Sequence, residues 1–293
     1  MGRSRGSGFR NIGCAVIALA AIALAQTVPQ QPSPDFVCPM HRDVRSATPG
    51  TCPRCGMRLV GAIPDVNPYP LSLALTPRAP KPGERVVLSF KIRDPKTATP
   101  VTRFEMVHER LFHMFIVSQD LEFLIHEHPA LLPDGTFQYE CHLPKRGMYR
   151  VLADYYPSGG TPQLTASTIF VPGGVLQTAH LDPDLAAKQA ANLEVELVSD
   201  PPRPIAGLPT LLFFRVQPAA GLEPYLGAWG HLLAASDDLI DMIHTHPFLA
   251  DGGPRIQFNM IFPRARPYRL WVQFQRMGVV NTAMFTVPVS ALR

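Results

Sequence analysis

The sequence predicts a mainly β fold that contains two copies of one domain. Proline supplies 32 of the 293 residues, which is about twice its average share and disfavours long helices. Apolar and polar residues alternate with period two in short runs such as Leu71 to Leu75 and Leu270 to Phe274, and turn signals such as Asp134-Gly135 separate the runs. An internal repeat relates the two halves of the chain.

Composition excludes two broad classes of protein. Hydrophobic residues make up 46% of the chain and charged residues 17%, which is too apolar for a disordered polyelectrolyte. The net charge is only +4, and lysine and arginine form no long run of the kind that follows a phosphate backbone. We therefore expect folded domains and no nucleic-acid partner.

Residues 1–25 have the pattern of a signal peptide. Three arginines precede an apolar stretch from Ile12 to Ala25 that ends in Ala-Leu-Ala. This stretch is shorter than the roughly 20 residues of a membrane-spanning helix. We expect a periplasmic or otherwise exported protein, with membrane contact only through an uncleaved leader. Residues 26–35, rich in proline and glutamine, predict a flexible linker.

Residues 36–62 predict a small metal-binding module of the zinc-ribbon type. Cys38-Pro-Met-His41 and Cys52-Pro-Arg-Cys55 are two turns in which proline stiffens the backbone and two side chains can point at one ion. Three thiolates and one imidazole suit Zn(II), and the thioethers of Met40 and Met57 would suit Cu(I). So short a segment needs the metal in order to fold. The choice between Zn and Cu stays open.

The same residues resemble the heavy-metal-binding domain found in some copper-transporting P-type ATPases and in periplasmic adaptors of metal-efflux pumps, whose pattern runs CPMHP…PGxCPxCGMxL. This chain departs from the pattern at Arg42 and Arg58, and neither position is a candidate ligand. The resemblance implies metal ions as partners, together with a metal-efflux or other envelope protein. The alternatives are a zinc knuckle that only folds a linker, or a disulfide between Cys52 and Cys55.

The internal repeat covers most of the remaining chain. HMFIVSQDLEFLIHEHP, from His113, aligns with HLLAASDDLIDMIHTHP, from His231, at a constant offset of 118 residues. We predict two tandem immunoglobulin-like β-sandwiches over residues 63–173 and 191–293. Residues 174–190 would join them through a linker with a short helix, for which the segment 182–191, with aspartate and proline at its start, is the candidate.

Each copy of the repeat carries three histidines. In His-x-His on a strand both side chains lie on one face, and a neighbouring strand can bring the third histidine beside them. Three imidazoles with an open fourth position suit Cu(II) or Zn(II). We therefore predict one metal site in each copy, formed by His113, His126 and His128 in the first and by His231, His244 and His246 in the second. The alternative is that these histidines are packing or turn residues.

Other candidate residues have no such pattern. His108, His142 and His180 lack a counterpart in the other copy and are expected to be surface or structural residues, with His108 close enough to His113 in sequence to serve as an auxiliary ligand. Cys141 is expected to be a buried thiol.

We expect an exported protein that binds copper, zinc or another heavy metal for resistance, storage or delivery, without enzymatic activity. Two alternatives remain. One is an adaptor of a metal-efflux system that holds only structural metal. The other is a copper redox enzyme that uses the histidine trios. The one G-x-S-x-G string, Gly2 to Gly6, lies within the predicted leader, and there is no H-E-x-x-H motif, so neither motif supports hydrolysis.

Overall fold

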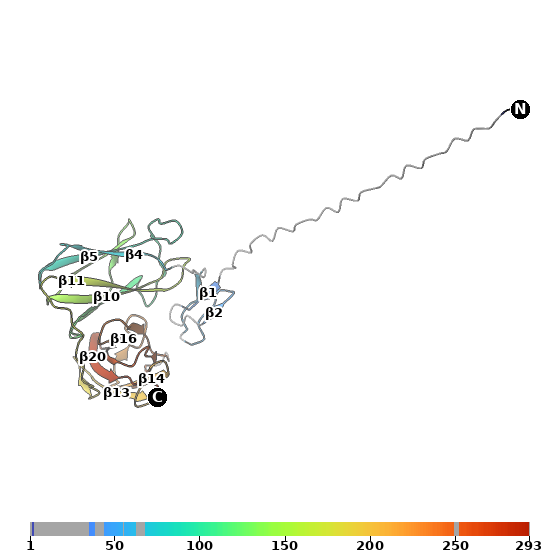
Figure 1. The fold of residues 1–293 in the computed structure, drawn as a ribbon. Coiled ribbons are helices and arrows are strands. Elements are labelled where there is room, and N and C mark those ends of the chain that lie inside the picture. Colours follow the sequence, from blue (N-terminus) through green and yellow to red (C-terminus); the bar gives the residue numbers. More distant parts are fainter. Residues whose placement is uncertain are drawn as a thin grey trace. The chain divides into compact units, whose positions relative to one another are not determined.

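Strands are the only regular elements in the parts of the chain that the computed structural model describes, which are residues 2, 35–38, 44–54, 56–62, 68–248 and 252–292 (Figure 1). The predicted mainly β fold is confirmed. The signal peptide and linker predicted for residues 1–35 lie outside the described residues, apart from Gly2 and Asp35. Over the described ranges, no helix has the length and apolar character that crossing a membrane requires.

The first sandwich consists of two antiparallel four-stranded sheets. One sheet has the order β4-β5-β9-β8, and the other has the order β11-β10-β6-β7. In chain order, the strands are β4 (Leu71–Thr76), β5 (Arg85–Ile92), β6 (Phe112–Ser118), β7 (Leu124–Glu127), β8 (Ala130–Leu131), β9 (Thr136–His142), β10 (Gly147–Tyr155) and β11 (Gln163–Val171). This is the immunoglobulin strand order, ABED on one sheet and GFC with an added C′ strand on the other, so the predicted fold class is confirmed.

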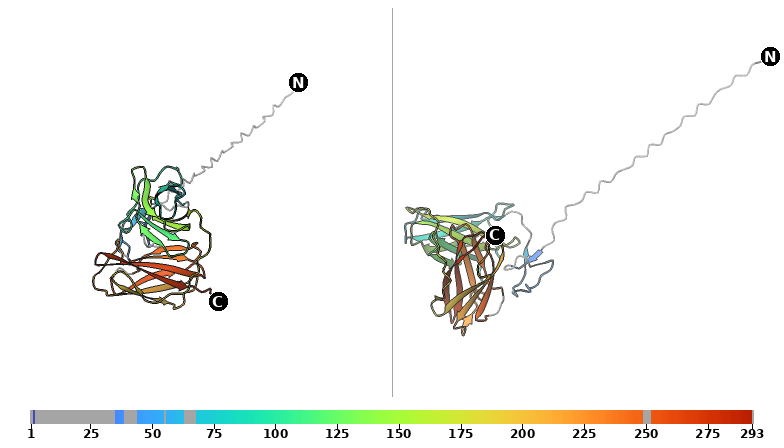
Figure 2. Two further views of the ribbon diagram at one scale, coloured as in Figure 1. Left: turned by 90° about the vertical axis from the view of Figure 1, so that its left-hand side faces the viewer. Right: turned by 60° about the horizontal axis from the view of Figure 1, so that its bottom comes forward.

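The second sandwich repeats this arrangement (Figure 2, yellow to red). Its strands are β12 (Lys188–Gln189), β13 (Glu194–Asp200), β14 (Pro209–Gln217), β15 (Leu222–Glu223), β16 (His231–Ser236), β17 (Met242–Thr245), β18 (Arg255–Ile261), β19 (Pro267–Arg276) and β20 (Val279–Pro288). Strand β16 corresponds to β6, and β17 to β7. In place of β8, this copy has a single bridge between Pro247 and Phe258.

A buried tyrosine near the start of the F strand anchors the preceding loop in both copies. The Tyr149 hydroxyl donates to the Lys145 carbonyl at 2.9 Å and accepts from the Lys145 N–H at 2.8 Å. The Tyr268 hydroxyl accepts from the Arg264 N–H at 3.2 Å and donates to the Asp241 carboxylate at 2.7 Å. This is the tyrosine corner of immunoglobulin-like sandwiches.

Strand β6 is buried on both faces along its whole length, as is β16. On one face of β6, alternate side chains such as Met114 and Ile116 belong to the core of the first sandwich. On the other face, Phe115 and Val117 form a separate apolar cluster with Leu233 of β16 and other residues of the second copy. The outer faces of the two GFCC′ sheets therefore pack against each other.

The helix predicted within residues 182–191 is wrong. Asp184 instead forms a β-bridge with Thr286, through two backbone hydrogen bonds of 2.9 and 3.0 Å, and β12 pairs with β13. Alanine-rich composition is only a weak local preference for helix. Here the strand edges of the second sandwich offer partners for the backbone, and those tertiary contacts prevail.

The module near the N-terminus contains a three-stranded antiparallel sheet of order β2-β1-β3. Its strands are β1 (Asp35–Val37), β2 (Arg45–Ser46) and β3 (Val60–Ala62). Its small buried cluster contains Cys38, Cys52 and Leu59. So few apolar side chains cannot stabilise an independent fold, which agrees with the expectation that a metal contributes to folding.

The tyrosine corner leads to a prediction about stability. Tyr149→Phe removes one accepted and one donated hydrogen bond and leaves the Lys145 N–H without its partner, so the free energy of unfolding should fall by about 1–3 kcal/mol. Urea denaturation of the metal-free protein measures this difference. Tyr139→Phe is the matched control, because burial is partial there and no protein hydrogen bond to its hydroxyl is found among the described residues. Equal stability losses in the two variants would contradict the assignment.

Candidate metal centre

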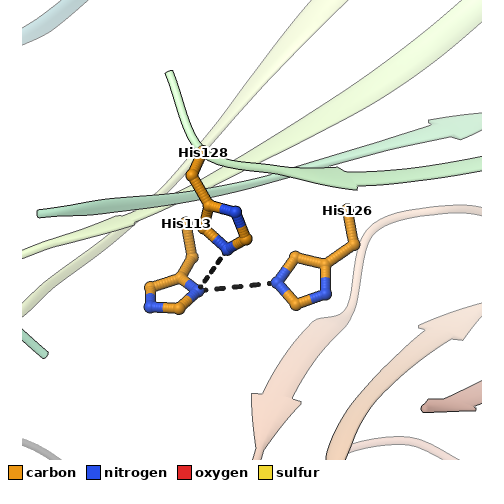
Figure 3. A group of neighbouring side chains, drawn as sticks. All are labelled: His113, His126 and His128. Carbon is orange, nitrogen blue, oxygen red and sulfur yellow. Dashed lines mark hydrogen bonds between the residues drawn. The ribbon is translucent and has the colours of Figure 1, made fainter. Parts of the chain in front are cut away.

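The first histidine trio lies at one end of the β6 and β7 pair. Phe115 pairs with His126 in the register of the two strands. The His-x-His pair, which has Glu127 at its centre, therefore lies beside His113. The Nδ1 atom of His113 lies 3.2 Å from Nε2 of His128 and 3.5 Å from Nε2 of His126 (Figure 3). One ring nitrogen from each residue falls within 4.8 Å of the other two.

The second trio has the same construction. Leu233 pairs with His244 in the register of β16 and β17, and Nε2 of His246 lies 3.1 Å from Nδ1 of His231. The three ring nitrogens again lie within 4.8 Å of one another. The structure therefore brings together both sets of residues that the repeat predicts. That they bind metal stays a prediction.

Backbone carbonyls orient the first histidine of each trio. Nε2 of His113 donates to the carbonyl of Val107 at 3.0 Å, and Nε2 of His231 donates to the carbonyl of Tyr225 at 2.9 Å. A neutral imidazole has one N–H, so in both residues Nδ1 carries a lone pair. In each copy that lone pair faces the other histidines of the trio.

The first histidine of each His-x-His pair is held by the opposite sandwich. Nδ1 of His126 donates to Oε1 of Gln273 at 2.6 Å, and Nδ1 of His244 donates to Oδ2 of Asp154 at 2.9 Å. The amide nitrogen of Gln273 donates to Thr282 at 3.1 Å, which turns its oxygen toward His126. These contacts fix the tautomers of both histidines, leaving the lone pair on Nε2.

Lone pairs therefore converge in the space between the rings. His113 Nδ1 and His126 Nε2, 3.5 Å apart, are both acceptors, because the other nitrogen of each ring already donates its proton. Nε2 of His244 is buried and has no hydrogen-bond partner within the described part of the chain. Two nitrogens bound to one tetrahedral Zn(II) lie about 3.3 Å apart, given Zn–N distances of about 2.0–2.1 Å. The observed separations fit a bound cation.

Burial keeps five imidazoles of the two trios neutral at neutral pH. Loss of solvent lowers the pKa of His113 to about 4 and that of His128 to about 3. The same cause, reinforced by neighbouring imidazoles, holds the pKa of His126, His231 and His246 well below the ordinary value. The neutral imidazole is the form that binds metal.

The two trios lie against each other, and we call their six histidines the histidine cluster. The ring centroids of His126 and His231 are 5.4 Å apart, and those of His113 and His244 are 5.7 Å apart. Within the first trio, the rings of His113 and His126 are 5.8 Å apart. The sequence predicts one site per copy and does not reveal that the sites meet. The signal that could have shown it is the unbroken apolar run of β6, which indicates burial on both faces.

His108 adjoins the second trio although it belongs to the first sandwich. Its ring stacks on His246 with the centroids 3.8 Å apart, and burial lowers its pKa to about 3. Its Nε2 atom has no hydrogen-bond partner among the residues described. Of the surface or structural positions expected for His108, the structure shows a buried one, because the contact with the second sandwich covers it. His142 and His180 are exposed, as expected.

Cys141 lies outside the cluster as a buried thiol in the core of the first sandwich, and burial raises its pKa to about 11. Met114 and Met242 are core residues.

The predicted ligands of the module are described only in part. Cys38 and Cys52 are buried side by side with Leu59, whereas His41, Cys55 and the auxiliary Met40 lie outside the described residues. Around Cys52, its N–H donates to the carbonyl of Met57 and its carbonyl accepts from the N–H of Gly56, each at 2.8 Å. This tight turn after Cys52 is the backbone arrangement expected for a metal knuckle. Gly56 has a φ of 72°, which favours glycine there.

Comparisons with known proteins support the module directly. The model of the heavy metal binding domain family matches residues 36–62, so the resemblance predicted for this segment is confirmed. No curated protein matches the chain.

Several solved structures match the chain at low similarity. The adhesin InvE of Yersinia pseudotuberculosis is 11% identical, with a TM-score of 0.25, over 74% of this chain and 58% of that structure. The Escherichia coli adhesin FdeC is 12% identical, with a TM-score of 0.25, over 80% and 68% respectively. A two-domain fibronectin type III segment of chicken tenascin is 7% identical, with a TM-score of 0.23, over 75% and 99%. The chain thus spans little more than half of the InvE structure, and similarity this weak gives no information about function.

One further family model matches the chain twice, at residues 66–173 and 187–291. The two matches coincide with the two sandwiches, and each contains one histidine trio. Together they cover more than half of the sequence, and the chain therefore belongs to the family described as Domain of unknown function (DUF8832).

Proposed function

We propose that this chain is an exported heavy-metal-binding protein that holds copper or zinc ions for resistance, storage or delivery. The observation that carries the proposal is the pair of lone pairs on His113 Nδ1 and His126 Nε2, which face each other at 3.5 Å. Buried polar atoms are normally hydrogen-bonded, and a cation between these two acceptors would give both of them a partner, with Nε2 of His128 as a third ligand 3.2 Å from His113 Nδ1. The heavy metal binding domain at residues 36–62 supports the same class of cargo.

The donor set favours copper or zinc over harder cations. Both trios offer only imidazole nitrogens, which suit Cu(II) and Zn(II), whereas Mg²⁺ and Ca²⁺ prefer oxygen ligands. The module adds thiolates, which also bind Cu(I). A cavity of about 140 Å³ adjoins the cluster and is lined by residues that include His108, His113, Asp154, His244 and His246. Binding and release of an ion need no substrate chemistry, so we propose a binding protein and no enzyme.

Export and the partner are further parts of the proposal. Export is supported by the arginines and the apolar stretch of residues 1–25. A metal-efflux or other envelope protein is the partner implied by the resemblance of the module. Delivery of an ion to such a membrane protein requires a site that holds the ion and a route by which the ion leaves.

Metal reconstitution tests this function. In a Cys38→Ser/Cys52→Ser background, which removes ligands of the module, the protein should retain Zn(II) or Cu(II) after dialysis, because both trios remain. His126→Ala and His244→Ala should each lower the retained metal by about one ion per chain, since each removes one of three ligands. Elemental analysis gives the stoichiometry, and His142→Ala, at an exposed position, is the control. The proposal would be wrong if the protein retained no metal, or if all variants retained equal amounts of metal.

The stability of the metal-free protein should depend on pH in a defined window. The pKa of His113 is about 4 in the folded protein and about 6.5 in the unfolded chain. The unfolded chain therefore binds more protons below pH 6.5, so stability is full above about pH 6.5 and falls toward about pH 4. His113 alone should contribute a loss of about 2–3 kcal/mol at about pH 4.5.

Urea unfolding of the chelator-treated protein between pH 7 and 4.5 measures this loss. Replacing the exposed His180 by Gln should leave the profile unchanged. A flat profile over the same range would show that the cluster is not buried and neutral in solution.

A further inference from the structure

We propose that the two trios form one dinuclear metal centre between the two sandwiches, in which the two ions occupy unequal positions and the second-copy position fills first. This inference rests on the proposed metal binding, and it adds that the two ions interact. Three observations carry it: the spacing of the rings, the hydrogen bonds that cross between the copies, and a difference between equivalent residues.

The spacing shows one cluster rather than two separate sites. The ring of His126 lies 5.4 Å from that of His231 and 6.0 Å from that of His244. These centroid distances match the 5.9 Å between His231 and His244, which belong to one trio. An ion held by either trio therefore has histidines of the other trio as immediate neighbours.

The crossing hydrogen bonds make each position depend on both sandwiches. Asp154 is the strand partner of His113, yet it accepts from His244 of the second trio. Gln273 is the strand partner of His231, yet it accepts from His126 of the first trio. Partners of this kind fix the orientation of metal-binding imidazoles. Neither trio is therefore fully oriented by its own sandwich.

The two positions differ in charge. Asp154 and Gln273 occupy equivalent strand positions, but Asp154 gives His244 a carboxylate partner, whereas Gln273 gives His126 a neutral amide. A carboxylate raises the basicity of the imidazole and contributes a negative charge that offsets the charge of the ion. His108 also lies against the second trio, and Leu226 stands at the equivalent place in the other copy. The second-copy position should therefore bind the first ion, and repulsion between two cations weakens the next.

Copper titration followed by electron paramagnetic resonance tests the inference. The protein is the full chain carrying Cys38→Ser/Cys52→Ser, and the probe is Cu(II). The first equivalent should give the signal of an isolated ion, and the second should broaden or diminish that signal because the two spins interact. Two isolated signals, or saturation at one ion per chain, would overturn the dinuclear centre while leaving metal binding intact. Binding of neither copper nor zinc would instead overturn the proposed function.

Two nearly isosteric variants test the inequality. Asp154→Asn should weaken binding of the first equivalent about tenfold and bring the two affinities closer together. Gln273→Glu should tighten binding of the second equivalent, because it gives His126 a negatively charged partner. Asp182→Asn, at an exposed aspartate, is the control. Unchanged affinity in both Asp154→Asn and Gln273→Glu would overturn the unequal positions, and circular dichroism confirms that each variant is folded.

Discussion

The packing of β6 against β16 is the contact on which the rest of the candidate site depends. Phe115 and Val117 on one side and Leu233 and Ala235 on the other bury the outer faces of two sheets that would otherwise meet water. His113 and His231 lie near the starts of these two strands, and the other four histidines lie on or just after the neighbouring strands β7 and β17. The apolar contact therefore sets the distance between the trios, excludes water from their rings, and places Asp154 and Gln273 within reach of the opposite copy. A salt bridge of 2.9 Å from Arg269 to Glu122 adds a polar contact between the two copies.

The fold could be predicted from the sequence because its signals are local. Period-two alternation and turn residues act within one strand or one loop, and the repeat shows the same local pattern twice. These signals predicted the sandwich fold and the two groups of histidines that the structure brings together. The helix at 182–191 was mispredicted because distant strand edges determine its backbone partners. His108 and the pair of Asp154 and Gln273 could not be assigned either, since their roles arise only when one copy docks on the other. Alignment of the repeats places Asp154 and Gln273 at equivalent positions. It does not show that each accepts a hydrogen bond from a histidine of the opposite copy.

Part of the divergence between the copies changes the chemistry of the cluster. The ring orientations are kept, because His113 and His231 each donate to a backbone carbonyl at the same offset, and a carbonyl tolerates substitution of its side chain. Two pairs of equivalent side chains differ in ways that affect ion binding. Asp154 of the first copy corresponds to Gln273 of the second, and His108 corresponds to Leu226. A duplicated domain retains the geometry of its site through the backbone, while side-chain changes make the two halves unequal.

Burial of the histidine cluster without a cation is costly for the folded protein, and this cost favours the metal-bound state. Desolvation and converging lone pairs destabilise the metal-free cluster, whereas the two sandwich cores, each with its own set of buried aromatic side chains, are large enough to hold the fold without it. The scaffold therefore remains folded when the ion leaves, and the His126 and His244 rings stay anchored across the interface. The module differs from the sandwiches, because Cys38, Cys52 and Leu59 form too small a core to keep it folded without metal. Metal loss should unfold the module first, so the two kinds of site would respond differently to the same chelator.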